Sequence, residues 1–317
     1  MKVLVTDKMA EEAIQALKDE GCDVTYEELD AESLLKEIPN YDALMVRSRT
    51  KAIKEVVEAG AKDNLKVIGR AGIGVDNIDI ETAGKLGIFV VNSPTGSTKS
   101  VAELTIGQML ALVRFIPKAD FSMKKGEWIK KQLKGTELNG KTLGLIGSAY
   151  IAQHVSKIAN CIGMKVLVYS PNCTDEKAEK MGAKRKDIKD LLKESDFVSL
   201  HIPHNKNSHY LLNKENIELM KNGAYLINSA RGGVVDEEAL YNALKSGKLS
   251  GAAVDVFEQE PPSKENKLLS LDNVILTPHI GASTKEAQIQ AGTVCAEQII
   301  KVLKGEEPDF CVNKKYL

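Results

Sequence analysis

The 317-residue sequence predicts an α/β protein with two doubly wound parallel sheets, and three observations support that fold class. Short runs rich in β-branched residues alternate with helical stretches along almost the whole chain, as they do in βαβ units. A long, mostly helical stretch over 97–124 divides this alternation into two series. An apolar helix over about 284–303 follows the second series and has no strand of its own.

Each predicted strand is a short apolar run. In the first series the strands are expected at 2–5, 43–46, 66–68 and 88–91, with a first helix at 10–18. Pro117 should kink or end the long helix, because proline lacks the backbone N–H and crowds the preceding turn. In the second series the strands are expected at 142–146, 165–169, 197–200, 224–228, 252–256 and 274–276.

The last helix determines the predicted domain limits. Because it lacks a sheet, we expect it to pack on the first series, which makes the first domain discontinuous. The predicted domains are then 1–98 with 284–317, and 99–283. The cleft between two such domains is the default place for a small-molecule site.

Composition excludes several classes of protein. The formal net charge is −1, from 43 basic and 44 acidic residues, so no global field favours nucleic acid or an anionic membrane. No apolar run reaches the roughly 18 residues of a membrane span, and no signal peptide is visible. An odd number of scattered cysteines predicts neither a disulfide framework nor a zinc site, and it fits the cytoplasm; they are Cys22, Cys161, Cys173, Cys295 and Cys311.

The stretch that follows the strand at 142–146 matches the dinucleotide fingerprint G-x-G-x-x-G/A with Gly147, Ala149 and Ala152 at its key positions. In this motif the first glycine makes a tight turn and a pyrophosphate lies on the N-terminus of the next helix. Ala149 replaces the second glycine, and its Cβ points where phosphate oxygens usually lie. An overpacked contact of this kind costs about 1–3 kcal/mol if nothing moves.

Ser170 stands where an acidic residue is expected for the ribose hydroxyls. The change from an acid to serine removes the carboxylate that would accept hydrogen bonds from those hydroxyls. It does not favour NADP, because no arginine follows at once to bind a 2′-phosphate. NAD is therefore the expected cofactor. The alternative interpretation of this segment is an ordinary βαβ turn without a cofactor.

Polar residues follow three successive predicted strands. Arg231 lies in NSARGGVVD, Glu258 and Glu260 lie in DVFEQEPP, and His279 lies in TPHIGAS. A protonated imidazole can give a proton to a carbonyl oxygen near neutral pH, and a carboxylate on the other ring nitrogen favours that protonated form. Arginine binds a substrate carboxylate with two parallel hydrogen bonds. Each residue alone could be an ordinary loop residue, but the set favours an enzyme.

Histidines at 201, 204 and 209 raise the question of a metal site. No carboxylate or cysteine pattern completes a set of ligands, so no metal is predicted.

The segments VRSRTK, GRAGIGVDNID, PTGSTKSVAELT, GTELNGKTLGLIG, NSARGGVVDEEAL, AAVDVFEQEPP and TPHIGASTKEAQ carry a resemblance that covers nearly the whole chain. The sequence resembles the D-isomer-specific 2-hydroxyacid dehydrogenases, most of all the members that act on 3-phosphoglycerate. The resemblance implies a flavodoxin-like substrate domain, an inserted Rossmann-type domain that binds NAD, and a dimerisation arm formed by the helix after Ser97.

The resemblance also implies roles for particular residues. Arg231, Glu260 and His279 are the catalytic set, and Glu258 is a bystander. Gly72 and Gly74 belong to a loop whose N–H groups meet the substrate, although an ordinary turn remains the alternative. The implied cofactor contacts are Gly147, Ala149, Tyr150, Ile151, Ser170, His201, Pro203, Ser229, Asp255 and Gly281, with Asp255 on the nicotinamide amide.

Arg47 and Arg70 match basic positions of the members that bind a phosphorylated substrate, and Lys130 stands where those members often have an arginine that reaches the partner subunit of a homodimer. Arg49 is an additional cation, and ordinary surface charge is the alternative for all four. The chain ends at Leu317, where many such members continue into a regulatory domain, so feedback inhibition by serine is not expected.

Two alternatives to oxidation of 3-phospho-D-glycerate remain. The substrate can be another small 2-keto acid such as hydroxypyruvate or glyoxylate. The chain can also be a non-catalytic regulatory protein on the same scaffold, because the cofactor loop is altered at Ala149, Tyr150 and Ser170.

Overall fold

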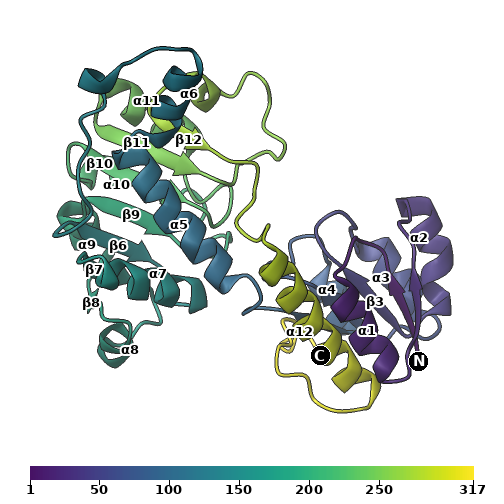
Figure 1. The fold of residues 1–317 in the computed structure, drawn as a ribbon. Coiled ribbons are helices and arrows are strands. Elements are labelled where there is room, and N and C mark those ends of the chain that lie inside the picture. Colours follow the sequence, from purple (N-terminus) through teal and green to yellow (C-terminus); the bar gives the residue numbers. More distant parts are fainter. The chain divides into compact units, whose positions relative to one another are not determined.

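The computed structural model describes all 317 residues, which divide into two compact units (Figure 1). The first unit consists of Met1–Thr98 and Ala282–Leu317, and the second is Lys99–Gly281. Each unit is built on its own parallel sheet, so the predicted fold class is confirmed.

The first unit has a five-stranded parallel sheet in the order β2-β1-β3-β4-β5, which is the flavodoxin-like order. Its strands are β1 (Lys2–Val5), β2 (Asp23–Tyr26), β3 (Ala43–Val46), β4 (Val67–Arg70) and β5 (Phe89–Asn92). Its helices are α1 (Glu11–Asp19), α2 (Ala31–Glu37), η1 (Ile38–Asn40), α3 (Lys54–Ala61), α4 (Ile80–Lys85) and α12 (Lys285–Leu303). The strand order reverses between β1 and β3, where ligands of such sheets bind.

Helix α12 belongs to the first unit although it comes last in the chain. It lies beside α1 (Figure 1), and Cys295, Ala296 and Ile299 are fully buried in the same core cluster as Val91. Gly69 of β4 makes room for this helix, since a Cβ there would lie 2.5 Å from Cδ1 of Ile299.

The second unit has a seven-stranded parallel sheet in the order β12-β11-β10-β9-β6-β7-β8, a Rossmann order with one further strand. Its strands are β6 (Thr142–Ile146), β7 (Lys165–Tyr169), β8 (Lys184–Arg185), β9 (Phe197–Leu200), β10 (Ala224–Asn228), β11 (Leu249–Val254) and β12 (Val274–Leu276). Its helices are α5 (Thr98–Val113), α6 (Ile116–Lys124), η2 (Lys130–Gln132), α7 (Tyr150–Cys161), α8 (Asp175–Lys180), α9 (Ile188–Glu194), α10 (Lys214–Leu219), α11 (Glu237–Ser246) and η3 (Lys267–Ser270). Here the strand order reverses between β6 and β9.

The long helical stretch breaks just before Pro117. Helix α5 ends at Val113, Phe115 takes a left-handed conformation with φ 54°, and Pro117 lies in the first turn of α6, where its missing N–H costs nothing. No single helix is long and apolar enough to cross a bilayer; α5 and α6 reach that length and composition only when counted together across a 63° bend.

The ten strands expected from the sequence are present, with ends that shift by up to three residues. The two strands that were not expected, β2 and β8, are both edge strands, and their side chains are exposed or half-buried. Half-exposed or two-residue strands lack the buried apolar run by which the others were recognised.

Candidate active site

Three loops at one edge of the second sheet carry the predicted catalytic residues. Arg231 follows β10, Glu260 follows β11 and His279 follows β12, and these three strands are neighbours in the sheet. Because all strands are parallel, their carboxyl ends meet at the same edge, as the sequence predicted.

Glu260 and His279 form a pair. Nδ1 of His279 lies 2.7 Å from Oε2 of Glu260, and the other oxygen of Glu260 accepts the backbone N–H of Phe257 at 3.0 Å. The carboxylate accepts only, so Nδ1 carries the proton and Nε2 faces away from this bond. The side chains are 49% and 37% exposed, so a substrate can reach the ring.

Asp255 holds the loop that presents His279. This side chain is 1% exposed, and its Oδ1 accepts the Thr277 hydroxyl at 2.6 Å and the Ile280 N–H at 2.9 Å. Its Oδ2 accepts the N–H of Gly281 at 2.9 Å. The backbone at His279 has φ 52°, an uncommon value outside glycine, and these bonds maintain it. The implied contact of Asp255 with a nicotinamide stays a prediction.

A buried chain of hydrogen bonds joins α5 to two of these loops. Ser229 donates to Oε1 of Gln108 at 3.0 Å, and the amide of Gln108 donates to the Thr277 hydroxyl at 3.2 Å. Thr277 in turn reaches Asp255. The sequence analysis did not single out Gln108 or Thr277. A glutamine that is 3% exposed within an apolar helix is the signal that could have found the first.

The glycines after Arg231 bring two loops together. A Cβ on Gly232 would lie 1.8 Å from the carbonyl oxygen of Phe257, whose N–H binds Glu260. Only glycine therefore allows the arginine loop to pack on the Glu260 loop. Asn228 fixes the turn, because its side chain binds the Ala230 N–H and the Arg231 carbonyl, both at 3.1 Å.

Glu258 stabilises the Glu260 loop through contacts with Tyr210 and Glu237. It accepts the Tyr210 hydroxyl at 3.1 Å and the Glu237 N–H at 3.1 Å. The hydrogen bond to Glu258 raises the pKa of Tyr210, because it stabilises the protonated phenol. These contacts are structural, and Glu258 makes none to the His279 ring.

The fingerprint loop lies at the point where the second sheet reverses. Gly147 has φ 119°, and a Cβ there would lie 2.3 Å from the carbonyl oxygen of His201, so the first glycine is required. Ala149 is the exposed N-cap of α7 in an extended conformation, with Tyr150 and Ile151 in the first turn. The first N–H groups of this helix have no intrahelical acceptor, which suits a pyrophosphate. The residues thus fit a dinucleotide at this loop.

His201, at the end of β9, is buried and neutral. Its Nε2 lies 2.9 Å from the Ser199 hydroxyl, Nδ1 has no partner, and burial lowers the pKa of the ring from 6.5 to about 4. Ser170 is half-buried after β7, and Pro203 is exposed. His204 and His209 contact each other at 3.1 Å, and no group of three or more metal-ligating residues is present.

The two neighbouring arginines of the first unit differ in their contacts. Arg49 binds Asp7, the carbonyls of Thr6 and Leu29, and lies 3.9 Å from Glu28. Arg47 follows β3 at the point of strand reversal, and its guanidinium binds only the Lys8 carbonyl, at 3.2 Å. Arg49 therefore holds the loop together, while most of the Arg47 guanidinium is available to a ligand.

Arg70, at the end of β4, reaches the same loop. Its Nη2 donates to the Ser48 hydroxyl at 3.1 Å. Gly72 has φ 152°, which residues with a side chain rarely adopt, and a Cβ there would lie 1.6 Å from Nη1 of Arg70, so a larger residue would have to displace this guanidinium. Gly74 is half-exposed in the same turn, and Lys130, in the second unit, is exposed in η2.

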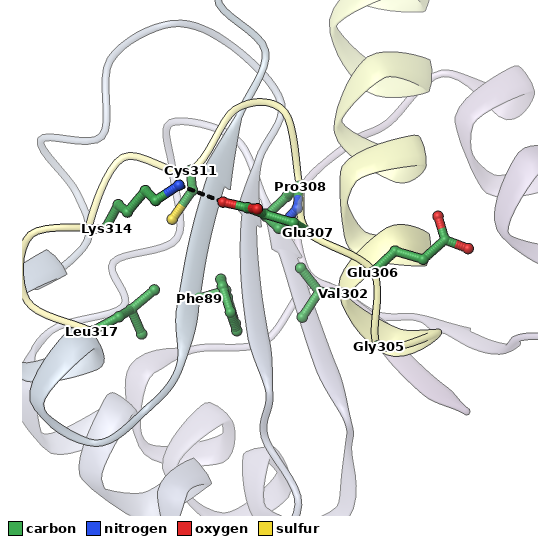
Figure 2. A pocket seen from close by; sticks show the side chains of 9 residues that line it. All are labelled: Phe89, Val302, Gly305, Glu306, Glu307, Pro308, Cys311, Lys314 and Leu317. Atoms are coloured by element: carbon green, nitrogen blue, oxygen red, sulfur yellow. Dashed lines mark hydrogen bonds and ion pairs between the residues drawn. The ribbon is translucent and has the colours of Figure 1, made fainter.

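A separate pocket of about 450 Å³ lies in the first unit between β5, the end of α12 and the C-terminal segment. Figure 2 shows apolar side chains such as Phe89 and Val302 in this pocket and an ion pair between Lys314 and Glu307. None of the predicted site residues lines it.

Comparisons with known proteins agree with this geometry. Residues 106–281 match the family model described as D-isomer specific 2-hydroxyacid dehydrogenase, NAD binding domain. The chain belongs to the D-isomer-specific 2-hydroxyacid dehydrogenase family and contains its NAD-binding domain.

Particular relatives are similar along the whole chain. D-3-phosphoglycerate dehydrogenase of Methanocaldococcus jannaschii is 52% identical over 99% of this chain and 59% of its own length. Hydroxypyruvate reductase of Thermotoga maritima is 50% identical over 95% of this chain and 98% of its own length. A glyoxylate reductase structure from Paecilomyes thermophila has a TM-score of 0.89 and 28% identity over 99% of both chains. The chain thus spans about three fifths of the phosphoglycerate dehydrogenase that it matches.

Proposed function

We propose that this chain is an NAD-dependent dehydrogenase that oxidises 3-phospho-D-glycerate reversibly to 3-phosphohydroxypyruvate, the entry to serine biosynthesis. The observation that carries the proposal is the 2.7 Å contact between His279 Nδ1 and Glu260, which leaves Nε2 for a substrate oxygen. The family membership of the chain and its similarity to phosphoglycerate dehydrogenases support it.

The proposed chemistry assigns one task to each residue. In oxidation, Nε2 of neutral His279 takes the hydroxyl proton as the C2 hydrogen leaves as hydride, which NAD accepts when bound. Glu260 stabilises the imidazolium that results, because it is an anion in contact with Nδ1. In reduction the imidazolium returns the proton to the carbonyl oxygen. Arg231 binds the substrate carboxylate.

The proposed phosphate ligand is Arg47, supported by its position at the strand reversal of the first unit and by its few protein contacts. Arg70 stands at the end of the next strand, and both are cations that suit a phosphate. Gly72 and Gly74 form the turn that we propose meets the substrate, through the N–H of Gly74, since the N–H of Gly72 donates to the Arg70 carbonyl at 2.8 Å. For the exposed Lys130 we propose only a charge contribution.

We further propose a cytoplasmic homodimer. Five large apolar side chains are exposed between α5 and η2, and such a group on a surface typically marks a protein interface. They are Leu110, Ile116, Phe121, Met123 and Trp128. The cytoplasmic assignment rests on five free cysteines, which fit a reducing compartment.

The test is NADH oxidation by the purified protein with 3-phosphohydroxypyruvate, beside hydroxypyruvate and glyoxylate, and with NADPH in parallel. The proposal expects the highest kcat/KM with NADH and the phosphorylated acid. A preference for hydroxypyruvate would instead favour the activity named for the Thermotoga maritima relative, which matches over 98% of its length. No turnover by folded protein with any pair would favour a non-catalytic protein on this scaffold.

A further inference from the structure

We propose that a cationic groove between α7 and α8 of the second unit binds a small molecule with several phosphate groups, and that its occupancy changes the affinity of the cofactor loop. The groove has a volume of about 620 Å³. The second part of the proposal rests on the proposed cofactor site, while the first part does not.

The charges that line the groove are all positive. Lys157 comes from α7, and Lys177 and Lys180 come from α8. No aspartate or glutamate lines the groove, and none of the three ammonium groups takes part in an ion pair within 4.0 Å. The chain as a whole has a net charge of −1, so this concentration of cations is local. Three like charges around one hollow repel each other, and an anion between them removes that repulsion.

The ligand class follows from the kind of cation. Lysine ammonium groups are compact point charges that bind phosphate oxygens, without the planar bidentate geometry that arginine offers to carboxylates and phosphates alike. No arginine lines the groove. Several phosphate groups are needed, because a single phosphate does not satisfy three separate cations.

Hydrogen bonds between α7 and the turn after α8 hold the wall of the groove in place. Asn160 of α7 donates to the Ser156 carbonyl at 2.8 Å and to the Gly182 carbonyl at 3.0 Å. Ser156 is fully buried, and its hydroxyl donates to the Met181 carbonyl at 2.6 Å. These bonds tie α7 to the turn after α8, so the lysines project from fixed backbones.

Two further side chains of the groove contact the cofactor loop. The amide of Gln153 donates to the Ser148 carbonyl at 3.1 Å, and Nδ1 of His154 lies 3.2 Å from the Tyr150 carbonyl. Ser148 and Tyr150 flank Ala149 at the N-terminus of α7. A phosphate that binds Gln153 or His154 therefore shifts the backbone of Ser148 and Tyr150, which belongs to the loop that we assign to the pyrophosphate of NAD. Binding at the two places is then coupled, and the coupling is reciprocal.

The first experiment is calorimetric titration of the full chain with inorganic tripolyphosphate at low salt. Substituting Lys157, Lys177 and Lys180 together by Gln should raise the Kd by about tenfold or more, since three charge pairs each contribute modestly. The matched control substitutes Lys165, Lys189 and Lys193 by Gln, which removes the same charge from exposed positions of the same unit. Equal Kd values for the two triple variants, or no binding by the wild type, would overturn the groove.

The second experiment measures the Kd of NADH with and without tripolyphosphate. The coupling predicts a change of about threefold or more in the wild type that disappears in the Lys157/Lys177/Lys180 variant. A change that persists in that variant indicates competition at the cofactor loop and overturns the coupling. A protein that binds tripolyphosphate through these lysines but never binds NADH would refute the proposed function while leaving the groove established.

Discussion

Asp7 in the first unit and Asp255 in the second each follow a strand of a parallel sheet, and each holds a neighbouring loop. Asp7 accepts the N–H of Arg47 at 2.6 Å and the Thr50 hydroxyl at 2.7 Å. Asp255 likewise accepts a threonine hydroxyl and two backbone N–H groups of the His279 loop. Both side chains are almost completely buried.

The two aspartates differ in what neutralises them. Nε of Arg49 lies 3.2 Å from Asp7, whereas Asp255 has only neutral hydrogen-bond donors as partners. The ion pair joins Asp7, which follows β1, to Arg49, which follows β3, whereas the neutral donors on Asp255 all belong to the loop that presents His279. This difference fits the proposed roles, in which the Arg47 loop binds the substrate and the His279 loop reacts with it.

The largest expected effect is on the histidine loop. His279→Ala removes the proposed acid and base, so kcat should fall by about 10²–10⁴-fold, the usual contribution of such a group. NADH binding, measured by titration, should remain nearly intact because the cofactor loop is separate. Wild-type activity in this variant would refute the catalytic assignment.

Lowering the pH should reduce the stability of the second unit more than that of the first, since all five histidines lie in the second. Burial lowers the pKa of His201 from 6.5 to about 4, so the unfolded chain binds the extra proton between these pH values. This contribution to stability is fully present above pH 6.5 and is lost as the pH falls towards 4, a change of about 3 kcal/mol. The free energy of unfolding, measured in urea, should differ less between pH 7 and pH 4.5 for His201→Gln than for the wild type. His209→Gln, on an exposed loop, should keep the wild-type difference.

Asparagine at the two buried aspartates tests their difference directly. Either change turns an acceptor into a donor that faces a donor, at a cost of about 1–3 kcal/mol. Asp7→Asn also loses the ion pair with Arg49, whereas Asp255→Asn removes a buried charge that has no counter-ion. We therefore expect Asp7→Asn to lower the free energy of unfolding more, and Asp255→Asn to lower kcat more. The reverse order in either measurement would contradict the comparison.

The sequence revealed the parts of this arrangement that depend on local pattern. Short apolar runs located β11 and β12, and the shared edge of parallel strand ends then placed Glu260 and His279 together. It did not reveal Asp7 or Gln108, because their partners lie 40 to 43 and 121 to 169 residues away in the chain. No local pattern encodes such contacts, since the fold alone brings the residues together.

The sequence favoured Arg47 as the phosphate ligand and left Arg49 as an additional cation, and a pair of substitutions tests this distinction. Arg47→Gln should raise KM for the phosphorylated acid by about tenfold, the loss of one charged contact, with little change for hydroxypyruvate. Arg49→Gln should lower the melting temperature and affect both substrates equally, because its guanidinium holds the loop. If Arg49→Gln alone changed the preference for phosphate, the two roles would have to be exchanged.

The smallest effect is expected at the cofactor loop, which has no buried aspartate to hold it. Ala149 already adopts an extended N-cap conformation with φ −82° and ψ −174°, and its side chain is exposed. Ala149→Gly keeps this backbone and removes only the Cβ that faces the expected pyrophosphate. If the Cβ intrudes, the Kd of NADH should fall by up to about tenfold, the value of one relieved steric contact. An unchanged Kd would mean that the loop accommodates alanine without strain. The glycine at Gly147, which His201 leaves no room to replace, would then be the part of the fingerprint that this chain requires.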